Sequence, residues 1–173
     1  MSGHAGPRPA PAACLTRVAP TSGRVLLPLL LALLAVSACT GTPDVPVSLP
    51  SGADTAPCSD VVDVLPVRLD ALGPRVVDPA SPLVRAWGDP AVVLRCGVSD
   101  PPGYDPTRTC LDVNGVGWYA EPQERAVRFT SRWSTPRIEV TVPSTYAPEA
   151  GWLSTLSSEL RPRLRHPGCP NAG

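Results

Sequence analysis

Proline limits the folds open to this chain more than any other feature. The 173 residues include 24 prolines and 14 glycines, which recur along the whole sequence. Proline lacks a backbone N–H and breaks a helix interior, and glycine punctuates turns. The sequence therefore predicts short elements joined by many turns rather than a mostly helical protein. Its length fits one folded domain.

Charge is balanced overall but uneven along the chain. Fifteen basic residues, all of them arginine, match 15 acidic residues, so the zero net charge gives no indication of a nucleic-acid partner. Arg8, Arg17 and Arg24 precede Cys39, whereas every acidic residue follows it. Hydrophobic residues make up 43%, which is too many for a wholly disordered chain.

An uncharged apolar run, Val25 to Ala38, follows Arg24 directly. It is shorter than the roughly 20 residues that a bilayer-spanning helix needs. A basic stretch, a short apolar run and small residues are the parts of an export signal. We therefore expect residues 1–38 to be a signal peptide.

The motif Val36-Ser37-Ala38-Cys39 resembles the bacterial lipobox. The cysteine thiol accepts a diacylglyceryl group, and the small residues before it fit the signal peptidase. The competing interpretation is a common signal peptide with an incidental cysteine beside its cleavage site. Stable anchoring takes more than one acyl chain, which a diacylated Cys39 would supply. The motif predicts a protein anchored by its lipid in the membrane, on the outer face of the cytoplasmic membrane.

Residues 39–57 are expected to be the lipidated N-terminus and a linker. The segment Thr40–Pro57 is rich in proline and has no apolar periodicity. Fully extended as polyproline it would reach at most ~55 Å. Residues 58–169 are then a single α+β domain, and residues 170–173 are a tail.

Four cysteines, Cys58, Cys96, Cys110 and Cys169, remain in the domain. An even number in a small exported domain predicts two disulfides. A metal site is disfavoured because no CxxC spacing occurs and His166 is the only histidine after Cys39. Four cysteines allow three connectivities, and the spacing does not choose between them.

Local patterns predict the elements of the domain. A helix should begin at Ser59 or Asp60 and be ended or kinked by Pro66. Residues 91–98 form a strand with Leu94 and Cys96 on one face and Arg95 on the other, and residues 148–160 form a second helix.

Two hairpins complete the prediction. The Asn114-Gly115 turn pairs Val113 with Val116 and residue 111 with residue 118. In the second hairpin, residues 126–133 and 138–143, we pair Trp133 with Ile138, which sets Trp133 on the buried face and residue 132 opposite residue 139. The expected fold class is α+β: a disulfide-stabilised antiparallel sheet of about five strands, covered on one face by an N-terminal and a C-terminal helix.

The order of these motifs is similar to a known family. A helix that begins at a cysteine is followed by AWGDP, VLRCGV, VNGVGW and RIEVTVP. This order resembles an exported actinobacterial family known as domain of unknown function 3515, over about Pro57 to Leu164. The resemblance implies that Cys58 pairs with Cys96 and that Cys110 pairs with Cys169. It implies no activity.

No catalytic, cofactor-binding or metal-binding motif is evident in the sequence. The arginines around the second hairpin, above all Arg128, Arg132 and Arg137, form either an anion-binding patch or a solvated sheet face balanced by glutamates, and we favour the balanced face. Trp87 lies beside a Gly-Asp-Pro turn and is the tryptophan we expect to be exposed for contact.

Two functions remain open. The first is a noncatalytic envelope lipoprotein that binds an envelope protein or a cell-wall component. The alternative is a hydrolase or transferase that acts on wall polysaccharide with two carboxylates. The sequence predicts no oligomeric state.

Overall fold

The computed structural model describes residues 42–51 and 57–170. The predicted signal peptide and Cys39 lie outside the described residues. Residues 42–173 belong to one compact unit, separate from residues 1–41. No helix in the described part is long and apolar enough to span a bilayer.

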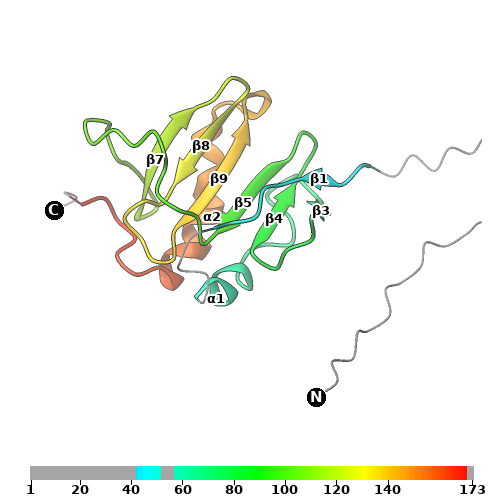
Figure 1. The fold of residues 1–173 in the computed structure, drawn as a ribbon, viewed down its shortest axis with the longest axis horizontal. Helices are drawn as coiled ribbons and strands as arrows, with labels where there is room; N and C mark the ends of the chain where they lie inside the picture. Colours follow the sequence, from blue (N-terminus) through cyan, green and yellow to red (C-terminus); the bar gives the residue numbers. More distant parts are fainter. Residues whose placement is uncertain (1–41, 52–56, 171–173) are drawn as a thin grey trace, which may run out of the picture. The chain divides into compact units, whose positions relative to one another are not determined.

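The domain is built on a seven-stranded antiparallel sheet with the strand order β2-β4-β5-β9-β8-β7-β6. Figure 1 shows the sheet with the helix α2 behind it. The strands are β2 (Pro74–Arg75), β4 (Val84–Trp87), β5 (Val92–Cys96), β6 (Leu111–Val113), β7 (Val116–Pro122), β8 (Ala126–Thr130) and β9 (Ile138–Pro143). The antiparallel sheet is confirmed, but it has seven strands rather than about five, because β2 and β4 extend it beyond β5.

The helical cover is smaller than we predicted. The only helix of two full turns in the described part is α2 (Leu153–Leu160), preceded by a 3₁₀ turn at Glu149–Trp152. The N-terminal helix α1 (Cys58–Val62) has five residues and ends before Pro66. Neither Ser59 nor Asp60 caps it, because the helix already begins at Cys58.

The core lies between the sheet and these helices. Alternate residues of β5 and β9 point into it, as the period of two in a strand requires. Trp118 donates its indole N–H to the hydroxyl of Ser157 at 3.0 Å, which ties β7 to α2 inside the core. The fully buried residues on this side include Cys58, Val61, Val92, Leu94, Cys96, Trp118, Ile138, Val140, Leu153, Leu156 and Leu160.

The first hairpin has the predicted register. Val113 lies opposite Val116, and Leu111 lies opposite Trp118. Asn114 and Gly115 have φ values of 51° and 77°, the left-handed region that this turn requires.

The second hairpin register is wrong by two residues. Phe129 lies opposite Val140 and Thr130 lies opposite Glu139, and β8 ends at Thr130. The loop closes early because the hydroxyl of Ser131 accepts the N–H of Ile138 at 2.8 Å. A shift of two residues keeps every strand side chain on its predicted face. It removes Trp133 from the strand, however, and leaves that side chain half-buried.

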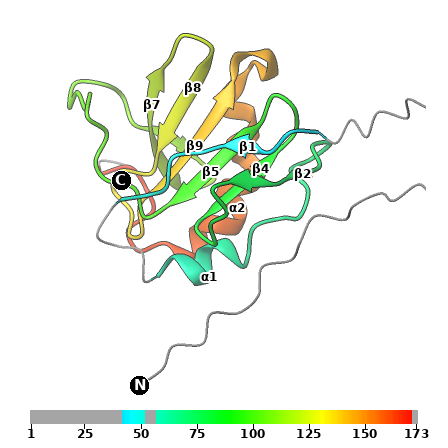
Figure 2. The same ribbon diagram turned by 45° about the vertical axis from the view of Figure 1, so that its right-hand side comes forward.

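Part of the expected linker packs on the domain. The strand β1 (Val45–Pro46) pairs in parallel with β3 (Val77–Asp78), and Val45 donates its N–H to Val76 at 2.8 Å. Figure 2 shows β1 running across the sheet face opposite α2. On this second face Val84 and Ala86 are only 2% and 3% exposed, since the N-terminal segment lies over that side of the sheet. The linker prediction is therefore wrong for this stretch.

Two disulfides are present, Cys58–Cys96 and Cys110–Cys169, the same pairs that the family resemblance implied. The second one packs against the backbone of β7. A Cβ atom added at Gly117 would lie 2.9 Å from the sulfur of Cys110 and 2.9 Å from the backbone nitrogen of Cys169. The close approach of disulfide and strand therefore requires glycine.

We expect Gly117→Ala to lower the free energy of unfolding by about 1–3 kcal/mol, because the new methyl group overpacks a site with no room. Gly151→Ala is the matched control, since nothing lies within 4 Å of its added Cβ. It should cause no loss, and a gain of up to about 1 kcal/mol. Urea unfolding with both disulfides oxidised measures the difference, and equal stability of the two variants would contradict the packing argument.

Candidate functional site

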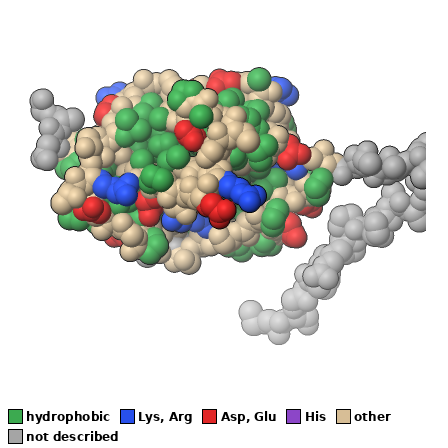
Figure 3. Space-filling model, turned by 90° about the horizontal axis from the view of Figure 1, so that it is seen from above, with side chains coloured by type: hydrophobic (Ala, Val, Ile, Leu, Met, Phe, Trp, Pro, Cys, Tyr) green, Lys and Arg blue, Asp and Glu red, His purple; other side chains and the backbone are tan. Residues whose placement is uncertain are grey.

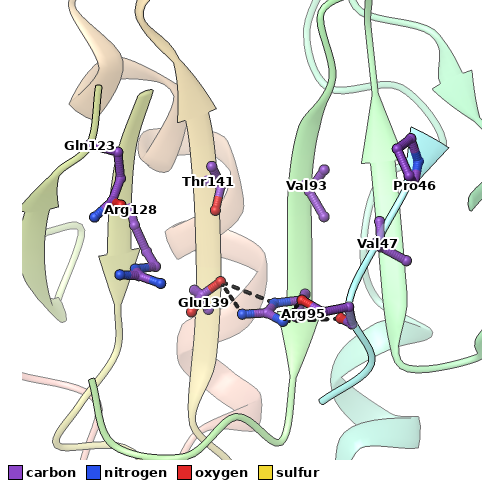
Figure 4. A pocket seen from close by; sticks show the side chains of 9 residues that line it. Pro46, Val47, Val93, Arg95, Gln123, Arg128, Glu139 and Thr141 are labelled. Atoms are coloured by element: carbon purple, nitrogen blue, oxygen red, sulfur yellow. Dashed lines mark hydrogen bonds and ion pairs between the residues drawn. The ribbon is translucent and has the colours of Figure 1, made fainter. Parts of the chain in front are cut away.

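The candidate site is a groove on the sheet face opposite α2, beside the N-terminal segment. It consists of two adjoining cavities of about 290 and 140 Å³. Both cavities are lined by Arg95, Arg128 and Glu139, so they form one continuous depression. Figure 4 shows these three side chains on the neighbouring strands β5, β8 and β9, with Pro46 and Val47 on the opposite wall. We call this depression the sheet groove.

Arg95 is the centre of the sheet groove. Its Nε and Nη2 atoms donate to one oxygen of Glu139 at 3.0 and 2.7 Å. Its Nη1 donates to the carbonyl and the hydroxyl of Ser48 at 3.0 and 2.7 Å. The two ionic side chains are 19% and 10% exposed, so the pair is well shielded from water. One guanidinium thus fastens the N-terminal segment to the sheet.

The β5 and β9 sequences place this pair. Arg95 lies directly opposite Glu139 in the β5–β9 register. Alternation along β5 sends Leu94 and Cys96 into the core and Arg95 to the other face, as we predicted from the sequence. Opposite charges on directly paired residues stabilise the register.

Arg128 leaves its strongest donors free in the sheet groove. Its Nε atom lies 3.3 Å from an oxygen of Glu121, its cross-strand partner on β7. Within the described residues, no hydrogen bond involves its two terminal nitrogens. The side chain is 26% exposed, and its terminal nitrogens are the donors that bind a carboxylate or phosphate in a bidentate manner.

Arg132 and Arg137 are bound elsewhere. Both contact the same oxygen of Asp100, at 3.4 and 3.1 Å. The guanidinium of Arg132 also lies 3.8 Å from the centre of the Tyr104 ring. The arginines of the second hairpin therefore do not converge on one anion patch. Their charges are balanced locally, by Asp100 as well as by glutamates.

Mixed charge also characterises the visible surface. On the face drawn in Figure 3, arginine side chains lie beside acidic ones, and apolar side chains form patches separated by polar surface. No group of three or more His, Cys, Asp or Glu side chains that could hold a metal ion occurs among the described residues. The candidate site therefore relies on arginine and hydrogen-bonding groups.

The expectation for Trp87 is wrong. This side chain is 1% exposed, and its indole N–H donates to the carbonyl of Pro66 at 3.1 Å. It lies opposite Val92 on the core side of the sheet, because β4 extends to Trp87 and the turn begins only at Gly88. Trp87 therefore cannot serve as a surface contact.

Sequence reasoning missed the roles of Ser48 and Glu139. Ser48 belongs to a stretch without periodicity, so no local signal marks its contact with Arg95. Glu139 was placed opposite residue 132, because our register was two residues out. Correct pairing of β5 with β9 would have identified it.

The fold and the site define a class: a small, disulfide-stabilised α+β domain with a polar groove across one sheet face. The family model described as "Protein of unknown function (DUF3515)" matches residues 24–166. The chain therefore belongs to this family. No curated protein and no solved structure matches the chain.

Replacing Arg95 should release the N-terminal segment, because hydrogen bonds to a charged group contribute about 1.5–3 kcal/mol. We expect Arg95→Ala to speed amide exchange at Val45 and Val47 about tenfold or more. Arg95→Lys keeps a charge beside Glu139 but cannot reach both partners at once, so it should have the same local effect with less loss of global stability.

The matched control is Arg85→Ala on the neighbouring strand β4, whose guanidinium, within residues 42–51 and 57–170, binds only the nearby carbonyls of Pro82 and Val84. It should leave exchange at Val45 unchanged. Unchanged exchange in both Arg95 variants would show that Arg95 does not hold the segment.

Proposed function

We propose that this chain is a lipoprotein anchored through Cys39 on the outer face of the cytoplasmic membrane, and that its domain is a noncatalytic binding module. The lipobox motif after a short apolar run supports the anchor. Two disulfides in a small domain support a location outside the cytosol.

The packing of the N-terminal segment shortens the expected tether. Arg75 donates to the carbonyl of Pro43 at 2.7 Å, and Val45 begins β1. Three residues lie between Cys39 and Pro43, and the four steps between their Cα atoms span at most about 14 Å. A lipid at Cys39 would hold the β1 end of the domain close to the headgroups, rather than at the ~55 Å that a fully free linker allows.

We assign the binding role to the sheet groove, and the free terminal nitrogens of Arg128 are the observation that carries this assignment. Arg95 binds both Glu139 and Ser48, which fixes the groove wall before any partner arrives. Arg128 is then placed to receive a carboxylate or phosphate. The partner is an envelope protein or a cell-wall component that presents such a group.

The alternative, polysaccharide cleavage by two carboxylates, is supported by one observation. Glu139 and Asp100 line the same part of the sheet groove. That cavity has a volume of only about 140 Å³, and both carboxylates are bound by arginines. Glycoside cleavage needs one carboxyl group that can donate a proton to the leaving group. The geometry therefore favours binding over hydrolysis.

We expect Cys39→Ser to move the protein from the membrane fraction to the soluble fraction, because the serine hydroxyl cannot form the thioether to diacylglycerol. Intact-mass analysis of the unaltered protein should show a diacylated N-terminal cysteine. Replacing Cys14, which the lipobox does not include, is the matched control and should change neither result. An unmodified thiol at Cys39 would overturn the anchor.

The binding role is tested by a photoreactive amino acid placed at Gln123, an exposed residue of the groove lining, in intact cells. We expect a discrete cross-linked adduct that disappears when Arg128→Gln is added, since the glutamine cannot make the charged bidentate contact. Arg125→Gln is the matched control, because the Arg125 side chain is 91% exposed and forms an ion pair with its neighbour Glu124.

A second control places the photoreactive residue at Glu159, exposed on α2 at the other face. No adduct at Gln123, equal adducts at the two positions, or an adduct that survives Arg128→Gln would each contradict the proposed groove. Turnover of wall polysaccharide that is lost in Glu139→Gln would favour the alternative instead.

A further inference from the structure

A second cavity, of about 470 Å³, lies beside the C-terminal end of the chain. Its volume is within the roughly 300–1,000 Å³ typical of small-molecule sites. It shares no lining residue with the sheet groove. We call it the aromatic pocket, and its main lining residues are Tyr104, Pro106, Arg108, Asp112, Trp133 and Pro170.

Trp133 differs from the other tryptophans of the domain. Trp87, Trp118 and Trp152 each donate the indole N–H inside the protein, at 3.1, 3.0 and 2.8 Å. Trp133 makes no such bond with any described residue, and its ring is half-buried in the wall of the aromatic pocket. Ligand-binding cavities are commonly lined by large aromatic side chains that also carry a hydrogen-bond donor.

Tyr104 forms a wall that is already rigid. Its ring contacts the guanidinium of Arg132, 3.8 Å from the ring centre, and the tilted ring of Tyr119, whose centre is 5.2 Å away. The hydroxyl of Tyr119 donates to Gly103 and accepts the N–H of Asp105, both at 2.9 Å, so it holds the backbone on either side of Tyr104. A preformed aromatic wall lowers the ordering cost of binding.

Two further constraints fix the rim. The hydroxyl and the N–H of Thr107 donate to Asp105 at 2.7 and 2.9 Å, and these bonds lower the pKa of Asp105. The Cys110–Cys169 disulfide lines the aromatic pocket and places Pro170 beside it. The walls thus come from three segments that are far apart in the sequence.

We infer that the aromatic pocket binds a neutral saccharide. A sugar ring has an apolar C–H face that packs on an indole or phenol ring, and hydroxyl groups at its edge that need both donors and acceptors. The residues that line the aromatic pocket include Trp133, Tyr104, Arg108 and Asp112, which together supply aromatic rings, donors and an acceptor. Arg108 uses one terminal nitrogen for the carbonyl of Ala120, at 3.3 Å. The opposite charges of Arg108 and Asp112 cancel, which suits an uncharged ligand.

A proline-rich peptide is the other occupant that aromatic pockets accept. It presents carbonyl acceptors and no backbone donors at its prolines. Its prolines therefore offer no donor to Asp112, an exposed residue that already accepts the N–H of Gly115 with one of its two oxygens. The sugar hydroxyl supplies that donor, so the saccharide is the better match.

The test is a fluorescence and calorimetric titration of the full chain in detergent with neutral tetrasaccharides built from glucose, mannose, galactose or N-acetylglucosamine. We expect at least one to bind with a change in tryptophan emission. Trp133→Phe should abolish that change, and Trp133→Ala should weaken binding about tenfold or more, because the stacking surface is lost.

Trp152→Phe is the matched control, since Trp152 is half-buried outside the aromatic pocket and its indole N–H is used internally. It should bind like the unaltered chain. Asp112→Asn and Arg108→Gln, which change exposed residues and spare the core, should each weaken binding several-fold. These variants keep the proposal testable if Trp133→Ala fails to fold.

Three results would overturn the proposal. They are the absence of binding by every tetrasaccharide, binding that is unchanged in Trp133→Ala, and saturable binding of octaproline in place of the sugars. The result is independent of the anchor and of the sheet groove, because Cys39→Ser and Arg128→Gln should leave the titration unchanged.

Discussion

The disulfide between Cys58 and Cys96 lies in the centre of the core, where both residues are 0% exposed. It joins the five-residue helix α1 to β5, the strand that carries Leu94 inward and Arg95 outward. A helix of that length has little stability of its own. The disulfide closes a loop of 38 residues, which lowers the entropy of the unfolded chain and so raises its free energy by about 4 kcal/mol. That is a large part of the free energy of unfolding of a small domain.

The side chains of β5 alternate between the two faces of the sheet, and each face is covered in a different way. Leu94 points toward α2, whose buried leucines and the Trp118–Ser157 bond complete the core. Arg95 points the other way. On that face no helix covers the sheet in the described part, and the guanidinium of Arg95 binds both Glu139 and the N-terminal segment. The second face therefore combines polar residues in the sheet groove with the buried Val84 and Ala86, and the groove lies beside the segment that covers this face.

The sequence predicted correctly those features that depend on neighbouring residues. The Asn114-Gly115 turn fixed the first hairpin, because both residues accept positive φ values. The register of the second hairpin was not predictable in this way, since a shift of two residues preserves the same buried face. The bonds of Ser131 that close the loop, among them its hydroxyl with the N–H of Ile138, follow from no periodicity. The contact of Ser48 with Arg95 spans 47 residues and follows from no periodicity. The sequence thus indicated the charged residues of the sheet groove, but it did not predict that the N-terminal segment forms one of its walls.

The loop that carries Asp100 and Tyr104 lines both the sheet groove and the aromatic pocket. Asp100 lines the smaller cavity of the sheet groove, whereas Tyr104 lines the aromatic pocket. Arg132 contacts both, through an ion pair with Asp100 and by stacking on Tyr104. One partly buried guanidinium therefore holds the wall in place from the two sides. Arg132 is 27% exposed and Asp100 is 55% exposed, so water reaches the ion pair, and the wall depends on the ion pair and the ring contact together. Arg132, one of the arginines that the sequence suggested as contact residues, thus joins the part of this loop beside the sheet groove to the part that lines the aromatic pocket.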